Sequence, residues 1–95
     1  MLSEQKYTPV RSARFKKGYA LGKKQKRDVA RLEEIVTLLA NGEKLPRNCY
    51  DHNLTGNLAG KRECHIEPDW LLVYSIDKGE LELYLLDVGT HSDLF

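Results

Sequence analysis

The chain of 95 residues contains three histidines, and all of them lie in its second half: His52, His65 and His91. Histidine is well suited to proton transfer near neutral pH, because its unperturbed pKa is about 6.5. Cleavage of RNA needs a base that takes the proton of the ribose 2′-hydroxyl and an acid that protonates the 5′-oxygen leaving group. Acid–base cleavage of a phosphodiester is therefore the first chemistry to consider.

Charged side chains surround the central histidine. Alternation along a strand puts Glu63, His65 and Glu67 on one face, and it turns Cys64 and Ile66 towards the core. Positive charge stabilises the negative charge that builds on a phosphate during cleavage. The same stretch supplies two cations for that purpose and one further carboxylate: Lys61, Arg62 and Asp69.

A zinc site is the competing interpretation, built from the three histidines with Cys64 or a carboxylate. The sequence contains no HxH, HxxxH or CxxC pair. Cys64 and His65 are neighbours, so a strand turns them to opposite faces. These spacings favour a site that uses no metal and no other cofactor. A single histidine is often structural, and the residues alone leave the role of each histidine open.

Two helices are expected in the first half. Residues 5–10 predict a short strand, with Pro9 at a sheet edge because proline cannot donate a ladder hydrogen bond. Ser12 can cap a helix over residues 13–22. A second helix is expected between a cap at Asp28 and a stop at Asn41-Gly42. Its apolar stripe has helical spacing: Val29, Leu32, Ile35, Val36 and Leu39.

The second half changes to strand patterns, expected over residues 62–67, 71–76 and 81–86. Lys78-Gly79 is a plausible turn between the last two. Residues 51–60 contain several glycines and asparagines and predict a loop. Two helices followed by strands predict an α+β fold, in which both helices pack on a small, mostly antiparallel sheet. The length suits one domain over residues 1–95.

Charge is unevenly distributed along the chain. Residues 1–31 hold ten Lys and Arg against two acidic residues, and residues 32–95 hold five against twelve. This pattern favours contact between the first third and a polyanion, although a solvated helix face has the same composition. No apolar run is long enough to cross a membrane, and the first residues lack a secretory signal. Two cysteines, Cys49 and Cys64, predict a reduced cytoplasmic protein, although their spacing does not exclude a disulfide.

Three separated segments carry a more specific pattern. Asp51 begins D-H-x-L-x-G, Arg62 begins R-E-x-H-I-x-P-D-W, and Gly89 begins G-T-H-x-x-L-F. In this order they closely resemble the YafQ-type toxins of the RelE superfamily, which are ribosome-dependent mRNA endonucleases of bacterial type II toxin–antitoxin pairs. The resemblance implies a RelE-like microbial RNase fold and cleavage of translated mRNA without a metal.

The same resemblance implies roles for individual residues. His91 would be the general acid, and His52 or Asp69 the base, with His65 and Glu63 orienting or sharing the proton. Leu94 would dock the chain's last segment. Four residues would contact the substrate, by clamping the phosphate, lining the pocket wall or stacking on a base: Lys61, Arg62, Trp70 and Phe95.

One position departs from the family pattern. Relatives often carry an arginine two residues before the glycine of the last motif, whereas this chain has Asp87. Either Lys61 and Arg62 supply the positive charge, or the protein is a catalytically weak module that binds its antitoxin and acts mainly as an operator co-repressor.

The implied partners are a cognate antitoxin and the ribosome with its mRNA. The antitoxin would be of the ribbon-helix-helix kind found in DinJ and RelB, acidic where it binds the toxin. Operator DNA would be contacted only through that complex, and no membrane would be involved. The resemblance gives the basic first third a purpose, which is to hold ribosomal RNA through its phosphates. The side chains concerned are Lys16, Lys17, Lys23, Lys24, Lys26 and Arg27.

Overall fold

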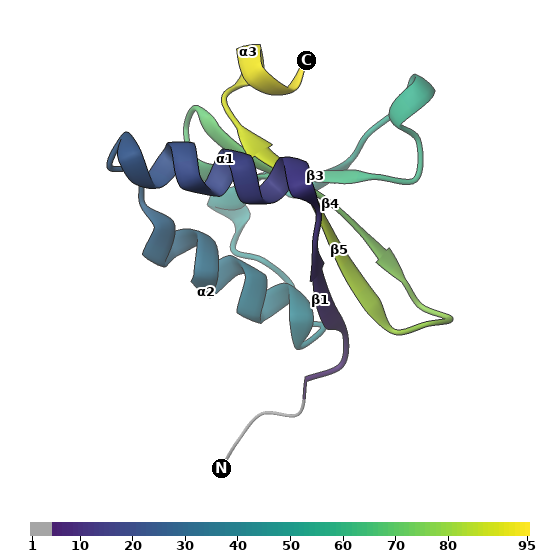
Figure 1. Cartoon of the computed structure of the whole chain (residues 1–95). Coiled ribbons are helices and arrows are strands. Elements are labelled where there is room, and N and C mark those ends of the chain that lie inside the picture. Colours follow the sequence, from purple (N-terminus) through teal and green to yellow (C-terminus); the bar gives the residue numbers. More distant parts are fainter. Residues whose placement is uncertain (1–4) are drawn as a thin grey trace.

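The computed structural model describes residues 5–95, in which two helices lie on one face of a five-stranded sheet (Figure 1). A short third helix, α3, follows the last strand, and two 3₁₀ turns, η1 and η2, lie in the middle of the chain. The elements are β1 (Thr8–Arg11), α1 (Ala13–Lys24), α2 (Val29–Ala40), η1 (Arg47–Cys49), β2 (His52–Asn53), η2 (Gly56–Leu58), β3 (Arg62–Glu67), β4 (Trp70–Asp77), β5 (Glu82–Gly89) and α3 (His91–Leu94).

The sheet has the order β1-β5-β4-β3-β2, and every neighbouring pair is antiparallel except β1 and β5. The predicted α+β fold is therefore confirmed. The first strand spans Thr8–Arg11 instead of residues 5–10, and Pro9 lies on an edge strand as expected. The predicted loop over residues 51–60 is wrong in part, because it contains β2 and η2.

Both long helices begin at the predicted caps. The backbone N–H of Phe15 donates to Ser12 Oγ at 3.0 Å, and that of Arg31 donates to Asp28 Oδ1 at 2.9 Å. Each bond satisfies a donor that the first turn of a helix leaves free. α2 stops before Gly42, whose φ of +75° suits glycine. None of the helices among residues 5–95 is long and apolar enough to cross a membrane.

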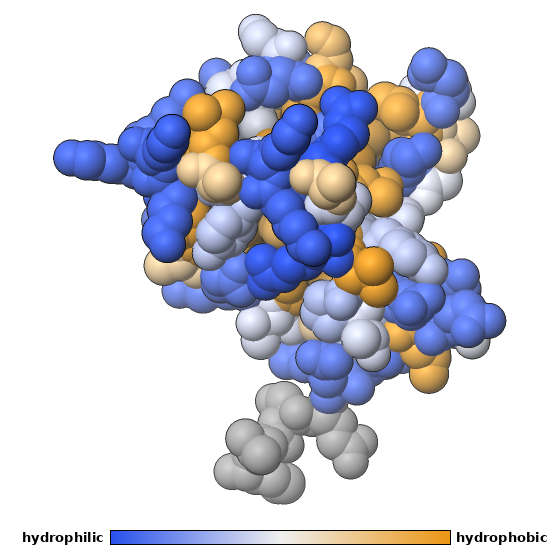
Figure 2. All heavy atoms as spheres, viewed as in Figure 1, coloured by the Kyte–Doolittle hydropathy of each residue, from blue (hydrophilic) through white to orange (hydrophobic). Residues whose placement is uncertain are grey.

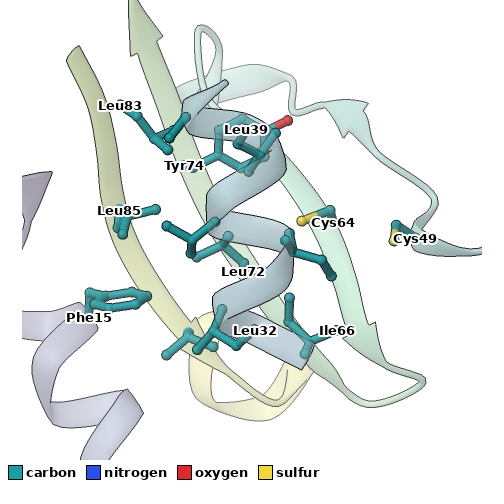
Figure 3. Close-up of a cluster of buried hydrophobic side chains, with 14 of the residues drawn as sticks. Phe15, Leu32, Leu39, Cys49, Cys64, Ile66, Leu72, Tyr74, Leu83 and Leu85 are labelled. Atoms are coloured by element: carbon teal, nitrogen blue, oxygen red, sulfur yellow. The ribbon is translucent and has the colours of Figure 1, made fainter. Parts of the chain in front are cut away.

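The hydrophobic core lies between α2 and one face of the sheet, which we call the helix face (Figure 3). Leu32 and Leu39 of α2 meet Cys64 and Leu72 from the strands. Burial raises the pKa of the Cys64 thiol, which keeps it protonated and poorly nucleophilic. Both cysteines, Cys49 and Cys64, are free and buried.

α1 lies very close to the sheet because it carries glycine at two contact positions. A Cβ atom at Gly18 would overlap the carbonyl oxygen of Val88, and one at Gly22 would overlap the indole of Trp70. The two glycines that lower the helix propensity of α1 thus allow it to approach β5 and β4.

The opposite side of the sheet, which we call the open face, carries Glu63, His65 and Asp87 beside the buried apolar residues Leu71 and Val73. Because cross-strand partners share a face, Glu63 of β3, Val73 of β4 and Asp87 of β5 form one row. A second row contains His65 and Leu71. In Figure 1, α3 and the loop with η2 rise on the same side of the molecule, above α1.

Candidate active site

Four aromatic and imidazole rings from separate parts of the chain form a line beside the open face. The ring centroids of Tyr50 and His65 are 5.6 Å apart, those of His65 and His91 6.0 Å, and those of His91 and Phe95 6.4 Å. Tyr50 follows η1, His65 lies on β3, and the last two residues belong to the α3 segment. The fold thus brings two of the three histidines next to each other.

All three histidines turn Nδ1 towards an oxygen that can accept a hydrogen bond. The partner of His52 is the carbonyl of Tyr50 at 2.6 Å, and that of His65 is the carbonyl of Pro68 at 3.2 Å. Nδ1 of His91 lies 3.3 Å from Asp69 Oδ1. Because these oxygens only accept, Nδ1 carries the proton in each ring and Nε2 stays available for proton exchange with a substrate.

Asp69 holds His91 in two ways. Its Oδ1 accepts from the backbone N–H of His91 and from the ring, both at 3.3 Å. These two hydrogen bonds lower the pKa of Asp69 below its ordinary value. The carboxylate therefore stays ionised and faces the ring that would carry positive charge during proton transfer.

The turn that carries His91 is fixed by a capping box. Thr90 Oγ1 accepts from the backbone N–H of Asp93 at 3.2 Å, and Asp93 Oδ2 accepts from the backbone N–H of Thr90 at 3.1 Å. This reciprocal pair defines the start of α3. It sets the direction in which His91 and Phe95 leave the sheet.

His52 approaches the site from β2, where it pairs with Glu63 in the sheet register. Its Nε2 is 3.7 Å from Glu63 Oε1. Glu63 is only 5% exposed, so the polar face expected from the strand pattern is buried at this position. His52 and Glu63 therefore form a second imidazole–carboxylate contact at the site, beside that of His91 and Asp69.

The predicted role of Arg62 as a phosphate clamp disagrees with its position. Its cross-strand partner is Tyr74, whose ring belongs to the core on the helix face. The Arg62 guanidinium binds Asp51 at 3.0 Å and also donates to Asn53 and to the Tyr74 hydroxyl. The Asp51 hydrogen bond raises the pKa of Arg62 further. Arg62 therefore ties β3 to the preceding loop on the face away from Glu63 and His65.

Trp70 and Glu67 also lie elsewhere than expected. Trp70 is 2% exposed, and its indole is buried against Gly22 of α1 in the core. It supports β4 from inside the molecule and presents no surface to a ligand. The β3 register shifts between His65 and Glu67, which breaks the predicted alternation. Glu67 pairs instead with Arg27 at 3.0 Å and accepts from the backbone N–H of Asp28.

A cleft with an apolar floor lies beside Phe95, which is 57% exposed. Figure 2 shows apolar side chains at the surface between α3 and the loop with η2. Lys61 stands at this cleft, on the other side of the strand from Arg62. The cleft is lined by residues of α1 and its cap, the η2 loop, β4, β5 and the α3 segment: Ser12, Ala13, Arg14, Leu58, Lys61, Val73, Leu86, Asp87, Leu94 and Phe95.

The unusual Asp87 forms an ion pair with Arg14 of α1, at 3.0 Å between Nη2 and Oδ2. Arg14 lies in no motif of the sequence, so it was not expected at the site. Tyr50, whose ring contacts His65, was likewise not expected there. No local pattern connects Arg14 with Asp87, so only the packing of α1 against β5 could bring them together.

Residues 5–95 contain no group of three or more His, Cys, Asp or Glu side chains arranged to hold a metal ion. The neighbouring imidazoles of His65 and His91 instead turn Nδ1 towards the Pro68 carbonyl and the Asp69 carboxylate.

Comparison with known proteins adds three findings. The model of a family described as "Bacterial toxin of type II toxin-antitoxin system, YafQ" matches residues 7–95. The mRNA interferase toxin YafQ of Escherichia coli K12 is 36% identical over 85 residues, which cover 88% of this chain and 90% of that protein. Two solved structures are also similar. A chain of the E. coli DinJ–YafQ toxin–antitoxin complex has a TM-score of 0.85 at 34% identity and covers 95% of this chain and 98% of its own. A metal-bound toxin from Helicobacter pylori has a TM-score of 0.88 at 40% identity, and the match covers 94% of this chain and 99% of that toxin.

Proposed function

The chain belongs to the YafQ family of bacterial type II toxins, and from this membership we propose that it is a ribosome-dependent endoribonuclease that cleaves translated mRNA by metal-independent acid–base catalysis. The observation that carries the proposal is the pair of adjacent imidazoles, His65 and His91, each with Nδ1 bound and Nε2 free. A phosphodiester between them can exchange protons with both rings.

His91 is the general acid in this proposal. Its imidazolium gives the Nε2 proton to the 5′-oxygen as the P–O5′ bond breaks, while the 2′-oxygen forms a bond to phosphorus. The products are a 2′,3′-cyclic phosphate and a free 5′-hydroxyl. Asp69 holds the ring in the required tautomer and stabilises its charged form, and it is therefore a positioning residue.

His65 is the base that we favour, since its ring is 6.0 Å from that of His91. This spacing suits two groups that act on opposite oxygens of one phosphorus. His52 is the alternative base, with the buried Glu63 beside its Nε2. Asp69, the other base considered from the sequence, already accepts two hydrogen bonds from His91.

The cleft beside Phe95 suits a nucleotide next to the cleaved bond. An exposed aromatic ring can stack on a base, which contributes about 1–3 kcal/mol. Lys61 at the same cleft can contact a backbone phosphate. Exposed lysines along α1 give a hydrophilic surface for ribosomal RNA (Figure 2): Lys16, Lys17, Lys23 and Lys24.

We propose an antitoxin as the second partner, because the similar E. coli toxin has been solved in complex with DinJ. A ribbon-helix-helix antitoxin with an acidic toxin-binding segment would complement the basic α1 surface and act in the cytoplasm. Operator DNA would be bound only by that complex. The alternative of a catalytically weak co-repressor depended on the negative charge of Asp87, and that charge is paired with Arg14.

The test is cleavage of a translated mRNA in a reconstituted translation system. We expect wild type to cut the message and His91→Ala to lose about 10²–10⁴-fold in rate with unchanged melting. Cleavage should persist in a ribosome-free control only at a much lower rate, and it should resist a chelator at a concentration that leaves ribosomes intact. If the message stays uncut while the protein binds its antitoxin tightly, the protein acts as a co-repressor. If the chelator abolishes cleavage, the protein is a metal-dependent hydrolase.

A further inference from the structure

We propose that Arg14 supplies the cation that stabilises the reacting RNA phosphate, and that Asp87 is the positioning residue that holds Arg14 at the cleft. This inference rests on the proposed endoribonuclease function. It gives Asp87 a supporting role in catalysis, where the sequence suggested a handicap.

The first support is that the reaction needs a cation at the phosphate, and the cation expected from the sequence, Arg62, does not face the site. Negative charge builds on the phosphate oxygens in the transition state, and a nearby guanidinium or ammonium stabilises it. Arg62 cannot do this, because it is bound to Asp51, Asn53 and Tyr74 on the side of β3 away from His65. Lys61 remains, and Arg14 lines the same cleft.

The second support is the state of the Asp87 carboxylate. One oxygen, Oδ1, accepts the backbone N–H of Val88 at 3.0 Å. The other, Oδ2, meets Nη2 of Arg14 at 3.0 Å. Both oxygens are therefore occupied by donors. Asp87 is largely buried, with 19% of its side chain exposed, so its position is fixed by the strand.

The third support is the exposure of Arg14. Its side chain is 74% exposed even though one nitrogen is bound to Asp87. A guanidinium has five N–H donors, so most of them remain available to a phosphate. A surface ion pair of this kind contributes little to stability, because solvent screens it. Holding the guanidinium in place is a better account of the pair than stabilising the fold.

The Arg14–Asp87 ion pair lies on the same face of the sheet as the histidine site. Asp87 lies in the same cross-strand row as Val73 and Glu63, one strand pair from β3. The register shift between Val73 and Tyr74 lies at this point of β4 and β5, where Ser12 Oγ also donates to the carbonyl of Leu86. The first turn of α1 is thereby fastened beside the irregular part of β5. Arg14 extends from that turn over the cleft that contains Phe95.

The neighbouring charges make the cleft cationic in spite of Asp87. Lys61 stands on one side of Arg14, and Lys17 shares a second hollow with Arg14 and Asp87. Asp93 also lines that second hollow, but its carboxylate is bound by the backbone of Thr90. Around the register shift of β4 and β5, the three cations thus outnumber the two carboxylates, and both carboxylates are already bound by donors.

The experiment compares cleavage rates of single variants and their combination in the reconstituted translation system. Arg14→Ala should lower kcat by about 10²-fold, and Arg14→Lys should retain part of the activity. Arg11→Ala is the matched control, because Arg11 also makes an exposed ion pair, with Glu33 at 3.2 Å, but does not line the cleft. It should cut at the wild-type rate.

Whether kcat falls or rises when Asp87 is replaced shows whether Asp87 supports catalysis by positioning Arg14 or hinders it by its negative charge. If Asp87 positions Arg14, Asp87→Asn should lower kcat by about tenfold in wild type and have no further effect in the Arg14→Ala background. Asp87→Glu should restore part of the rate. A rise in rate for Asp87→Asn, or an unchanged rate for Arg14→Ala, would overturn the proposal while leaving the nuclease function intact. Failure of wild type itself to cut would instead contradict the proposed function.

Discussion

The carboxylate of Asp69 binds His91 twice, at 3.3 Å from its backbone nitrogen and 3.3 Å from its ring nitrogen Nδ1. The two residues lie on different elements, since Asp69 is in the turn before β4 and His91 begins α3. One oxygen therefore sets both the position of the α3 segment and the tautomer of the imidazole.

Replacing Asp69 with asparagine should impair catalysis by changing the tautomer. The amide of asparagine can donate to Nδ1 of His91, which favours the ring form with the opposite proton arrangement and withdraws support from the imidazolium. We expect kcat to fall by about tenfold or more, with a smaller change in KM. A profile of rate against pH for wild type and Asp69→Asn checks this, because a purely structural change would lower the rate equally at every pH.

The same contact should contribute to stability in a manner that depends on pH. Because the pKa of Asp69 is lowered on folding from 3.8, the unfolded chain binds more protons at acidic pH. The contribution is therefore present above pH about 4 and lost as the pH falls through the lowered pKa. Urea denaturation at several pH values should show wild type losing more stability on acidification than Asp69→Asn. Glu80→Gln, a change of one exposed carboxylate, is the control.

Lys61 and Arg62 are neighbours with opposite expected phenotypes. Arg62→Met removes the ion pair to Asp51 and the hydrogen bond that the Tyr74 hydroxyl accepts, and it leaves the partly buried Tyr74–Asp51 contact without its cation, which should lower the free energy of unfolding by about 1–3 kcal/mol. Lys61→Met removes a half-buried charge from the cleft and should weaken RNA binding with little change in stability. Chemical denaturation and RNA binding, measured for both variants, test the pair. Equal loss of RNA binding after correction for unfolded protein would contradict the assignment of faces.

The close approach of α1 to the sheet should make Gly22 intolerant of any side chain. In Gly22→Ala the new methyl group overlaps the Trp70 indole, so that helix and strand must separate. We expect a loss of about 1–3 kcal/mol despite the better helix propensity of alanine. At the exposed Gly79 a Cβ atom would lie 3.3 Å from Asp77 Oδ1, without the overlap found at Gly22. Gly79→Ala is therefore the control. Melting curves should show a lower midpoint for Gly22→Ala and little change for Gly79→Ala.

Periodicity and capping residues were sufficient to predict the fold class, because both long helices begin at side-chain caps and α2 buries a regular apolar stripe. They failed where strand pairing is irregular. The register shift after His65 sends Glu67 to Arg27, and the shift between Val73 and Tyr74 lies where β5 presents Asp87. Such shifts depend on the partner strand, which no local pattern contains.

Only part of the candidate site could be predicted, because some of its residues lie outside any local sequence pattern. The three histidines and Asp69 could be identified because they lie in motifs, and the structure shows how His65, Asp69 and His91 meet. Arg14 carries no motif. The start of α3 did leave a signal that was overlooked, since Thr90 and Asp93 have the spacing of a capping box. The exposure of Arg62 could not be judged from alternation alone, because its partner Asp51 lies in a loop.

The parallel pairing of β1 with β5 has a consequence for the order in which the molecule can form. A ribosome releases the chain from its first residue onwards, yet β1 and α1 both need β5 as their partner. Contacts of such long sequence separation form late and slow the overall reaction. The sheet therefore stays incomplete until residues 82–89 have emerged. His91 and Phe95 come after β5 in the chain, so the contact of the His91 ring with His65 also has to wait for this strand.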